Sequence, residues 1–460
     1  MTETPPYQVT DPATGEVVER FAHATDAEVE AALTASASAS ERWRRWPLAE
    51  RAEVVKRVGA LFTERAAGLG ALVTREMGKR PSSARGEAAY CATIFDYYAD
   101  HGPALLSDRP VPGHAGARIE RLPVGPLLGV MPWNYPYSQV ARFAAPNLLA
   151  GNTVLIKHAE NCPSSALAIA DLMRDAGVPD GVYLNLFATH EQVAAMIADP
   201  RVRGVSLTGS ERAGAAVAEA AGRHLKKVVL ELGGSDAYIV LDTDDAAAAA
   251  EQAWVTRMAN VGQACNSNKR MIVMEDVYDD FVASLVKQAS AMTPRLPGDD
   301  SDTSYSPMAS RNAAETLLAQ VQDAVAKGAV LQVGGDLPSG QGAYFAPAVL
   351  TDVTPDMRAY HEELFGPVAV VYKVSSDDEA VAVANAVDFG LGGSVWGTDE
   401  ERAAKVAGRL EVGMTNVNTP AGEGPDLPFG GIKRSGFGRE LGPLGLDEFV
   451  NLRLFYVNQR

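Results

Sequence analysis

Cys265 is the residue of this sequence best suited to act as a nucleophile. It stands in the segment NVGQACNSNKR, before the apolar strand candidate RMIVME, and Gly262 allows the backbone to approach a ligand closely. Cysteine is among the most buried residue types, so a structural role is the usual alternative. The polar, Gly- and Asn-rich surroundings favour a reactive thiol at Cys265, whereas Cys91, in the apolar helix candidate AAYCATIFDYY, keeps the structural interpretation.

Two other segments carry groups that would assist a thiol. Glu231 ends the apolar strand candidate KVVLE and precedes two glycines, so a general base would stand at the carboxyl end of a strand, where α/β proteins bind ligands. Asn134 lies in PWNYP, a rigid aromatic frame suited to an amide that stabilises an oxyanion. The structural alternatives are a solvated strand-end acid and a hydrogen-bonded Asn in an aromatic turn.

A nucleotide-binding loop is present only in a loose form. The sequence has no GxGxxG after a first strand and no GxxxxGK[ST]. The strand candidate GVSLT runs into Gly209 and Ser210 before a helix, and a helix amino terminus can hold a pyrophosphate. Lys157, at the end of VLIK, and Glu160 would lie at the same sheet edge, next to a ribose. The alternative is an ordinary helix cap and two solvated charges.

The elements that must position these residues follow a regular order. Thr25 and Glu28 form a candidate capping box, and three helical stretches follow it to about Asp100. The polar, Pro-rich residues 101–125 then interrupt the helical pattern, and we expect them to form a hairpin that leaves the body of the domain. This hairpin is a candidate oligomerisation element.

The rest of the chain alternates short apolar runs with amphipathic helical segments. One alternation covers residues 129–240 and a second covers residues 244–418, so the predicted fold class is α/β with parallel sheets in both parts. The segment LDEFVNLRLFYVN near residue 450 is rich in β-formers. It is expected to pair either with an edge strand of another subunit or with a strand of its own chain.

Composition excludes several classes of function. The 460 residues carry 41 Lys and Arg against 58 Asp and Glu, a net charge of −17, which argues against a surface for nucleic acid or for an anionic membrane. Neither a signal peptide nor a membrane-spanning apolar run is evident, so we expect a cytoplasmic protein. Three scattered Cys, seven His and no HExxH predict neither a disulfide framework nor a metal site.

Taken together, the motifs resemble those of the aldehyde dehydrogenase superfamily over nearly the whole chain. The resemblance implies a Rossmann-like NAD(P)-binding domain (residues 1–104 and 123–233), an α/β catalytic domain (residues 234–440) and a small β oligomerisation element (residues 105–122 and 441–460). It also implies a homodimer or homotetramer. The motifs that carry it are PWNYP, KHAE, TGS, ELGGSD, GQAC, EELFGP and PFGGIKRSGFGRE.

The same resemblance implies a role for each candidate residue. Cys265 is the nucleophile, Asn134 with the Cys265 backbone amide forms the oxyanion hole, and Glu231 activates the water that releases the product. The implied reaction oxidises an aldehyde to a carboxylic acid through a thiohemiacetal and a thioester on Cys265. The residues implied to bind the cofactor are Trp133, Lys157, Glu160, Gly209, Ser210, Leu232, Glu363 and Phe365.

Within the superfamily the chain resembles the succinate-semialdehyde dehydrogenase group, in which an arginine at the position of Arg142 holds the substrate carboxylate. An arginine fork matches a carboxylate with two hydrogen bonds; the alternative is a solvated helix arginine. Three positions depart from the pattern. Ala259 stands where some members have a second arginine, with Arg257 two residues earlier; Phe143 replaces a lysine; and Glu423 would repel a carboxylate.

Succinate semialdehyde is therefore the expected substrate, and NAD the expected cofactor in preference to NADP. The cofactor preference rests on Glu160, which would accept hydrogen bonds from ribose hydroxyls and repel a 2′-phosphate. Other aliphatic, aromatic or amino aldehydes remain alternatives for the substrate. A CoA-acylating enzyme is less favoured because Glu231 serves hydrolysis, and a catalytically silent relative would not need Cys265, Glu231 and Asn134 together.

Overall fold

Residues 26–105 form a helical layer. In the computed structural model, which describes residues 6–422 and 424–458, three long helices follow a short amino-terminal hairpin. The capping box at Thr25 is confirmed: its hydroxyl accepts a hydrogen bond from the Glu28 amide, and the Glu28 carboxylate accepts one from the Thr25 amide. The elements are β1 (Tyr7–Thr10), β2 (Val17–Phe21), α1 (Asp26–Trp43), α2 (Leu48–Met77) and α3 (Pro81–Leu105).

The helices cover a six-stranded sheet with the order β21-β9-β8-β5-β6-β7. Five neighbouring strands are parallel and only β21 runs antiparallel. The chain places later strands on both sides of β5, so the order reverses between β5 and β8, where ligands bind in open α/β sheets. The strands are β5 (Pro126–Val130), β6 (Thr153–Lys157), β7 (Tyr183–Asn185), β8 (Gly204–Thr208), β9 (Lys227–Glu231) and β21 (Gly436–Phe437).

Helices connect these strands in the expected alternation. Every residue of β6 and β8 is buried, as is typical of parallel strands with both faces covered. The connecting helices are α4 (Ser138–Ala150), α5 (Pro163–Asp175), α6 (His190–Ala198) and α7 (Glu211–Arg223).

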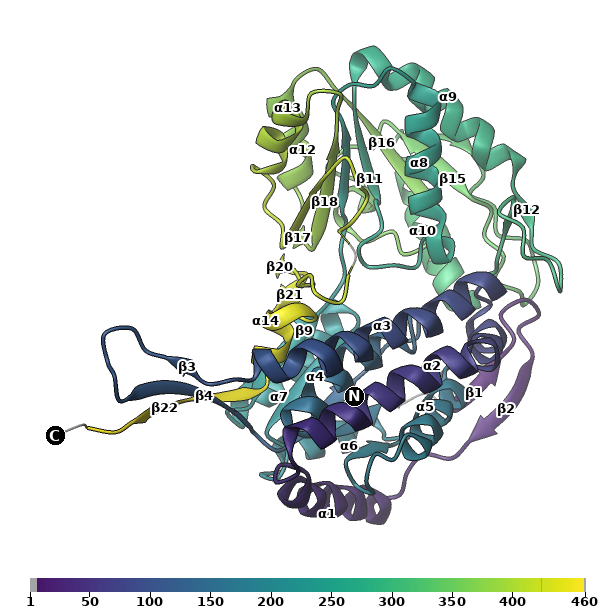
Figure 1. The fold of residues 1–460 in the computed structure, drawn as a ribbon. Coiled ribbons are helices and arrows are strands. Elements are labelled where there is room, and N and C mark those ends of the chain that lie inside the picture. The colour runs from purple at the N-terminus through teal and green to yellow at the C-terminus, as the bar shows by residue number, and fades with distance from the viewer. Residues whose placement is uncertain (1–5, 423, 459–460) are drawn as a thin grey trace.

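A second sheet lies above the first and has seven strands in the order β14-β15-β16-β11-β10-β18-β19 (Figure 1). All its pairings are parallel except that of β14 with β15. Its strands are β10 (Ala237–Val240), β11 (Arg270–Met274), β14 (Val330–Val333), β15 (Ala348–Thr351), β16 (Val368–Val374), β18 (Gly392–Trp396) and β19 (Met414–Val417). Its helices are α8 (Ala246–Met258), α9 (Glu275–Ala291), α10 (Arg311–Ala326), α12 (Asp377–Asn385) and α13 (Glu400–Ala407).

Shorter elements connect the two bodies and complete their edges. The short helices include η1 (Ala259–Gly262), which leads to Cys265, and α14 (Gly442–Asp447), which leads to the last strand. The remaining short elements are the helix α11 (Arg358–His361) and the strands β12 (Thr293–Pro294), β13 (Ser304–Tyr305), β17 (Phe389–Gly390) and β20 (Ile432–Lys433).

Three strands form an arm that projects from the body (Figure 1). They are β3 (Arg109–Pro110), β4 (Ala117–Pro123) and β22 (Val450–Tyr456). β22 pairs antiparallel with β4 of the same chain over its full length, so the intrachain alternative for this segment is the one observed. Leu452, Leu454 and Tyr456 are each more than half exposed, so the arm presents apolar side chains to its surroundings.

The α/β class predicted from the sequence is confirmed, and the domain limits given above remain a prediction. Each large sheet has buried apolar clusters on its faces. Among residues 6–422 and 424–458, no helix is both long and apolar enough to cross a membrane.

Candidate active site

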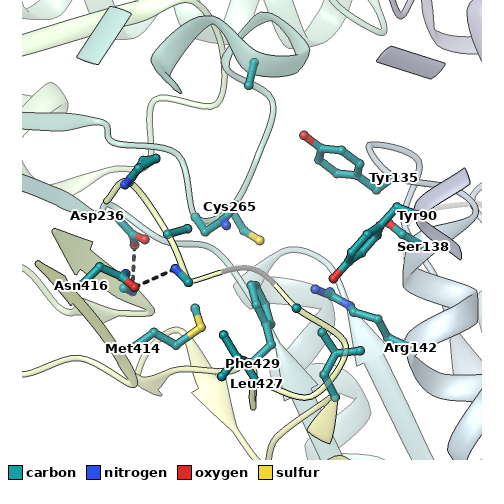
Figure 2. Close-up of a pocket in the computed structure, with 18 of the residues that line it drawn as sticks. Tyr90, Tyr135, Ser138, Arg142, Asp236, Cys265, Met414, Asn416, Leu427 and Phe429 are labelled. Carbon is teal, nitrogen blue, oxygen red and sulfur yellow. Dashed lines mark hydrogen bonds between the residues drawn. The ribbon is translucent and has the colours of Figure 1, made fainter. Parts of the chain in front are cut away.

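A cavity of about 640 Å³ lies where the two bodies meet, and Cys265 lines it (Figure 2). One wall comes from the helical layer and carries Tyr90 of α3 and Arg142 of α4. The opposite wall comes from the second sheet and carries Asp236 and Asn416. A substrate in this cavity would therefore contact both bodies beside a thiol.

The backbone that leads to Cys265 is strained. Asn260, Val261 and Gly262 have consecutive φ angles of 50°, 56° and 70°, all in the left-handed region. A β-branched residue such as Val261 is a clear outlier there. At Gly262 a Cβ atom would also lie 2.3 Å from the Gly366 carbonyl oxygen, so only glycine fits. Strain of this kind persists only where the surroundings hold it, and it concentrates at functional sites.

Arg257 fixes this turn through side-chain hydrogen bonds. Its side chain is fully buried and donates hydrogen bonds of 2.6–3.2 Å to the carbonyls of Gly262, Leu364, Gly366 and Val368 and to the Ser267 hydroxyl. Arg257 therefore faces backbone oxygens and not the cavity. Arg257 therefore does not replace the second arginine with which some superfamily members contact the substrate.

Asn134 lies next to the turn. Its Nδ2 donates to the Gln263 carbonyl at 3.1 Å, and the side-chain Nδ2 of Asn260 donates to the Asn134 carbonyl at 3.0 Å. The loop after β5 and the loop that carries Cys265 are thus hydrogen-bonded to each other. The structure brings together the amide and the thiol that the sequence pointed to separately.

Glu231 is the end residue of β9, with only 1% of its surface exposed. Among the residues that the structure describes, neither of its carboxylate oxygens has a hydrogen-bond partner. Burial raises the pKa of Glu231 well above its ordinary value, and Glu440 acts in the same direction while Arg142 opposes it. A carboxyl group with a raised pKa is suited to accept a proton near neutral pH.

Arg142 is buried at the cavity wall and is not the solvated arginine of the alternative interpretation. Its Nε lies 2.8 Å from Glu440 Oε2, its Nη2 contacts Gln139, and its guanidinium lies 4.3 Å from the centre of the Phe429 ring. Glu440 belongs to the motif SGFGRE, but no sequence pattern marks it as a neighbour of Arg142. A carboxylate ligand would share this guanidinium with Glu440.

The thiol itself is unactivated in this arrangement. Burial raises the pKa of Cys265 to about 12, and the positive charges of Arg142 and Lys269 act in the opposite direction. A thiol with such a pKa is protonated at neutral pH, and only the thiolate is a strong nucleophile. The two cations therefore bear directly on the reactivity of Cys265.

The carboxyl ends of β5, β6 and β8 bring the expected cofactor residues to one edge of the sheet. Lys157 Nζ lies 2.5 Å from Glu160 Oε1, and His190 Nε2 lies 3.5 Å from the same oxygen. Gly209 and Ser210 lead into α7, where the Ser210 hydroxyl caps the helix. In the described chain the Thr208 hydroxyl is buried without a partner at this edge, so it is available to a ligand.

The nicotinamide side of the expected site lies nearer the cavity. The Trp133 and Phe365 rings meet edge to face with centroids 5.7 Å apart. Glu363 Oε1 accepts a hydrogen bond from the Gly234 amide at 3.1 Å, and Leu232 is buried at the end of β9. The helix terminus, the nearby cations and the ribose-side carboxylate thus suit a dinucleotide. Within the described ranges, His, Cys, Asp and Glu side chains form no group that could hold a metal ion.

The fold and the site define an oxidoreductase of the dinucleotide-dependent, thiol-based class. The aldehyde dehydrogenase family model matches residues 1–455. The chain belongs to the aldehyde dehydrogenase family, as its motifs indicated.

Curated relatives and solved structures agree with this assignment. The chain is 52% identical to a protein of Deinococcus radiodurans named succinate-semialdehyde dehydrogenase [NADP(+)], over 98% of this chain and 94% of that protein. It is 44% identical to succinate-semialdehyde dehydrogenase [NADP(+)] 1 of Mycobacterium ulcerans, over 98% of this chain and all of that protein. The structure of succinic semialdehyde dehydrogenase from Streptococcus pyogenes in complex with NADP+ superposes with a TM-score of 0.94 at 40% identity, covering 98% of this chain and 99% of that one.

The expected preference for NAD over NADP is wrong. The relatives from Deinococcus radiodurans and Mycobacterium ulcerans are named as NADP(+) enzymes, and the Streptococcus pyogenes structure contains NADP+. The expectation rested on repulsion between the Glu160 carboxylate and a phosphate. In the structure Glu160 is paired with Lys157 at 2.5 Å, and the His190 ring lies 3.5 Å from the same carboxylate oxygen, so the carboxylate does not meet a phosphate alone. Glu423, one of the positions that depart from the pattern of the succinate-semialdehyde dehydrogenase group, lies outside the described residues.

The buried Glu231 carboxylate makes stability depend on pH. Because its pKa is higher in the folded protein than in the unfolded chain, the associated stability is present below the ordinary Glu pKa and is lost as pH rises through the raised value. We expect Glu231→Gln to be increasingly more stable than wild type as pH rises from 5 towards 9, by up to about 1.4 kcal/mol for each pH unit of pKa elevation. Urea unfolding at several pH values measures this, and Glu251→Gln, at an exposed residue of α8, is the control. Parallel pH profiles for wild type and Glu231→Gln would contradict the burial argument.

Proposed function

We propose that this protein oxidises succinate semialdehyde to succinate with NADP+ as the oxidant. The observation that carries the proposal is Arg142, a buried guanidinium at the wall of the cavity that contains the Cys265 thiol. An arginine in that position suits an aldehyde with a carboxylate at its far end. The names of the relatives described above support the same substrate.

The reaction follows from the residues around the cavity. Once the thiol proton has passed to solvent, the Cys265 thiolate adds to the aldehyde carbon, and the side-chain amide of Asn134 with the Cys265 backbone N–H stabilises the oxyanion that forms. Bound NADP+ would supply the acceptor for the hydride of this carbon, and loss of that hydride would leave a thioester on Cys265. Glu231 takes a proton from water, the resulting hydroxide attacks the thioester, and the acid leaves as the thiolate is restored.

The cofactor proposal assigns a separate task to each end of the dinucleotide site. Lys157 and His190 would hold the 2′-phosphate while Glu160 accepts a ribose hydrogen bond. Gly209, Ser210 and the start of α7 would hold the pyrophosphate. The remaining candidates would bind the nicotinamide end; they are Trp133, Leu232, Glu363 and Phe365.

An aminoaldehyde is the second candidate substrate. Asp236 is a buried carboxyl on the cavity wall opposite Arg142, and burial raises its pKa to about 7. An ionised Asp236 would attract an ammonium group and repel a carboxylate. A comparison of the two charged aldehydes therefore decides between Arg142 and Asp236 as the residue that sets specificity.

We expect Arg142→Gln to lower kcat/KM for succinate semialdehyde by about 10- to 100-fold more than kcat/KM for butanal, because a charged hydrogen bond is worth about 1.5–3 kcal/mol. NADPH formation measures both rates. Butanal has the same chain length without the charge, so it corrects for damage from an unpaired Glu440. Equal losses for both aldehydes, or a wild-type preference for 4-aminobutanal, would contradict the proposed substrate.

The cofactor assignment predicts a phosphate-specific loss in His190→Ala. Binding of 2′,5′-ADP should weaken by about fivefold, in line with about 1 kcal/mol for an exposed charge pair, and binding of 5′-AMP should change little. Competition against NADP+ fluorescence quenching gives both affinities. His224→Ala, at an exposed histidine after α7, is the matched control. The same loss for both nucleotides would show that His190 does not contact the phosphate.

We further propose the domain limits given by the resemblance, with the arm as an oligomerisation element of a homodimer or homotetramer. The exposed Leu452, Leu454 and Tyr456 on β22 support this assignment, because a small sheet with apolar side chains in water is marginal alone.

Leu454→Asp is expected to shift the protein to a smaller species, because it sets a charge in an apolar contact. Light scattering coupled to gel filtration measures the mass. Leu296→Asp alters an exposed leucine next to β12, on the other side of the molecule from the arm (Figure 1), and should leave the mass unchanged. A monomeric wild type, or an unchanged mass for Leu454→Asp, would rule out the arm as the contact.

A further inference from the structure

Lys269 is a buried cation that the proposed reaction does not use. Its side chain is 1% exposed, and its Nζ donates to the carbonyls of Ala264 at 2.7 Å and Cys265 at 2.8 Å. Glu363 Oε1 lies 3.0 Å from the same nitrogen. The three hydrogens of the ammonium group thus have three acceptors. A buried lysine is costly unless its charge is matched in this way.

The contacts of Lys269 join two parts of the site. One part is the loop whose carbonyls flank the nucleophile, and the other is Glu363, to which the proposed function gives the nicotinamide ribose. Glu363 also accepts from the Gly234 amide, three residues after Glu231. Lys269 and Glu363 therefore form a bridge between the thiol, the base and the cofactor side.

The charges around Cys265 make this bridge relevant to the thiol. Four charged groups face Cys265: Arg142 and Lys269 favour the thiolate, while Glu231 and Glu363 oppose it. Arg142 is matched by Glu440 at 2.8 Å. Lys269 faces Glu363 and Asp236 in turn. When Glu363 binds a ribose, its ion pair with Lys269 can change, and the electrostatic potential at Cys265 changes with it.

We propose that Lys269 is a positioning residue for Cys265, one that fixes the carbonyls of the nucleophile loop and, paired with Glu363, sets the fraction of Cys265 present as thiolate. The part played by the cofactor rests on the proposed function, whereas the effect on the thiol does not. A purely structural role is the competing explanation, in which Lys269 only neutralises the buried carboxylates. The two differ in what they predict for the acidity of the thiol.

The test is the pH profile of Cys265 alkylation by iodoacetamide, read by mass spectrometry in wild type, Lys269→Met, Lys269→Arg and Glu363→Gln. Lys269→Met should slow alkylation by about tenfold at each pH between 7 and 9, as expected when the pKa of the thiol rises by about one unit. Glu363→Gln should speed alkylation, since a negative charge is lost. Lys269→Arg should restore most of the wild-type profile, and the Lys269→Met/Glu363→Gln double variant should be non-additive.

The other cysteines report whether each variant is folded. Cys91 and Cys162 are buried, so they should remain unlabelled in any native variant. An unchanged alkylation rate in folded Lys269→Met, or rate changes in the same direction in Lys269→Met and Glu363→Gln, would overturn the proposal. The assay needs neither aldehyde nor NADP+, so its result does not depend on whether the proposed substrate is correct.

Discussion

The left-handed turn at Asn260–Gly262 is the constraint on which the rest of the site depends. A backbone in this conformation is unfavourable, and it survives here because Arg257 binds four carbonyls and a hydroxyl around it. Those carbonyls belong to the turn, to residues 364–366 and to β16, so one guanidinium fixes the nucleophile loop to the second sheet. The position of the Cys265 thiol between the two bodies follows from that anchorage.

Charge burial is the second organising feature, and it follows from the first. A nucleophile at the junction of two bodies is partly shielded from water, which makes its ionisation less favourable. Two buried cations beside the thiol favour its ionisation, and each is paired with a carboxylate: Arg142 with Glu440 and Lys269 with Glu363. Glu231 has no such partner, and its raised pKa is the direct result. Glu231, which has no cationic partner, is therefore suited to act as a base, whereas Glu440 and Glu363 serve as counter-ions to Arg142 and Lys269.

The sequence was sufficient to predict the α/β class and the alternation of helices and strands, because strand ends and apolar periodicity are local signals. It also pointed to Asn134 and Cys265, which lie on two hydrogen-bonded loops, while the roles of these residues and of Glu231 stay predictions. It was not sufficient for partners of long side chains. Arg257 reaches the Val368 carbonyl across 111 residues, and no spacing rule gives that contact. Lys269 and Glu440 were inside quoted motifs but were missed for the same reason. The NAD preference failed because Glu160 is paired with Lys157 and lies near His190, a residue of another element whose position no spacing rule gives.

The arm gives the chain a defined order of events during synthesis. β4 is complete at residue 123, whereas β22 begins at residue 450, so a ribosome must add more than 300 residues before the two can pair, as the 333-residue separation of Glu120 and Arg453 illustrates. Loop closure over such a length comes late in folding. Until β22 is made, the edge of β4 that it will cover stays unpaired, and an unpaired strand edge can associate with another chain while the sheets are still forming.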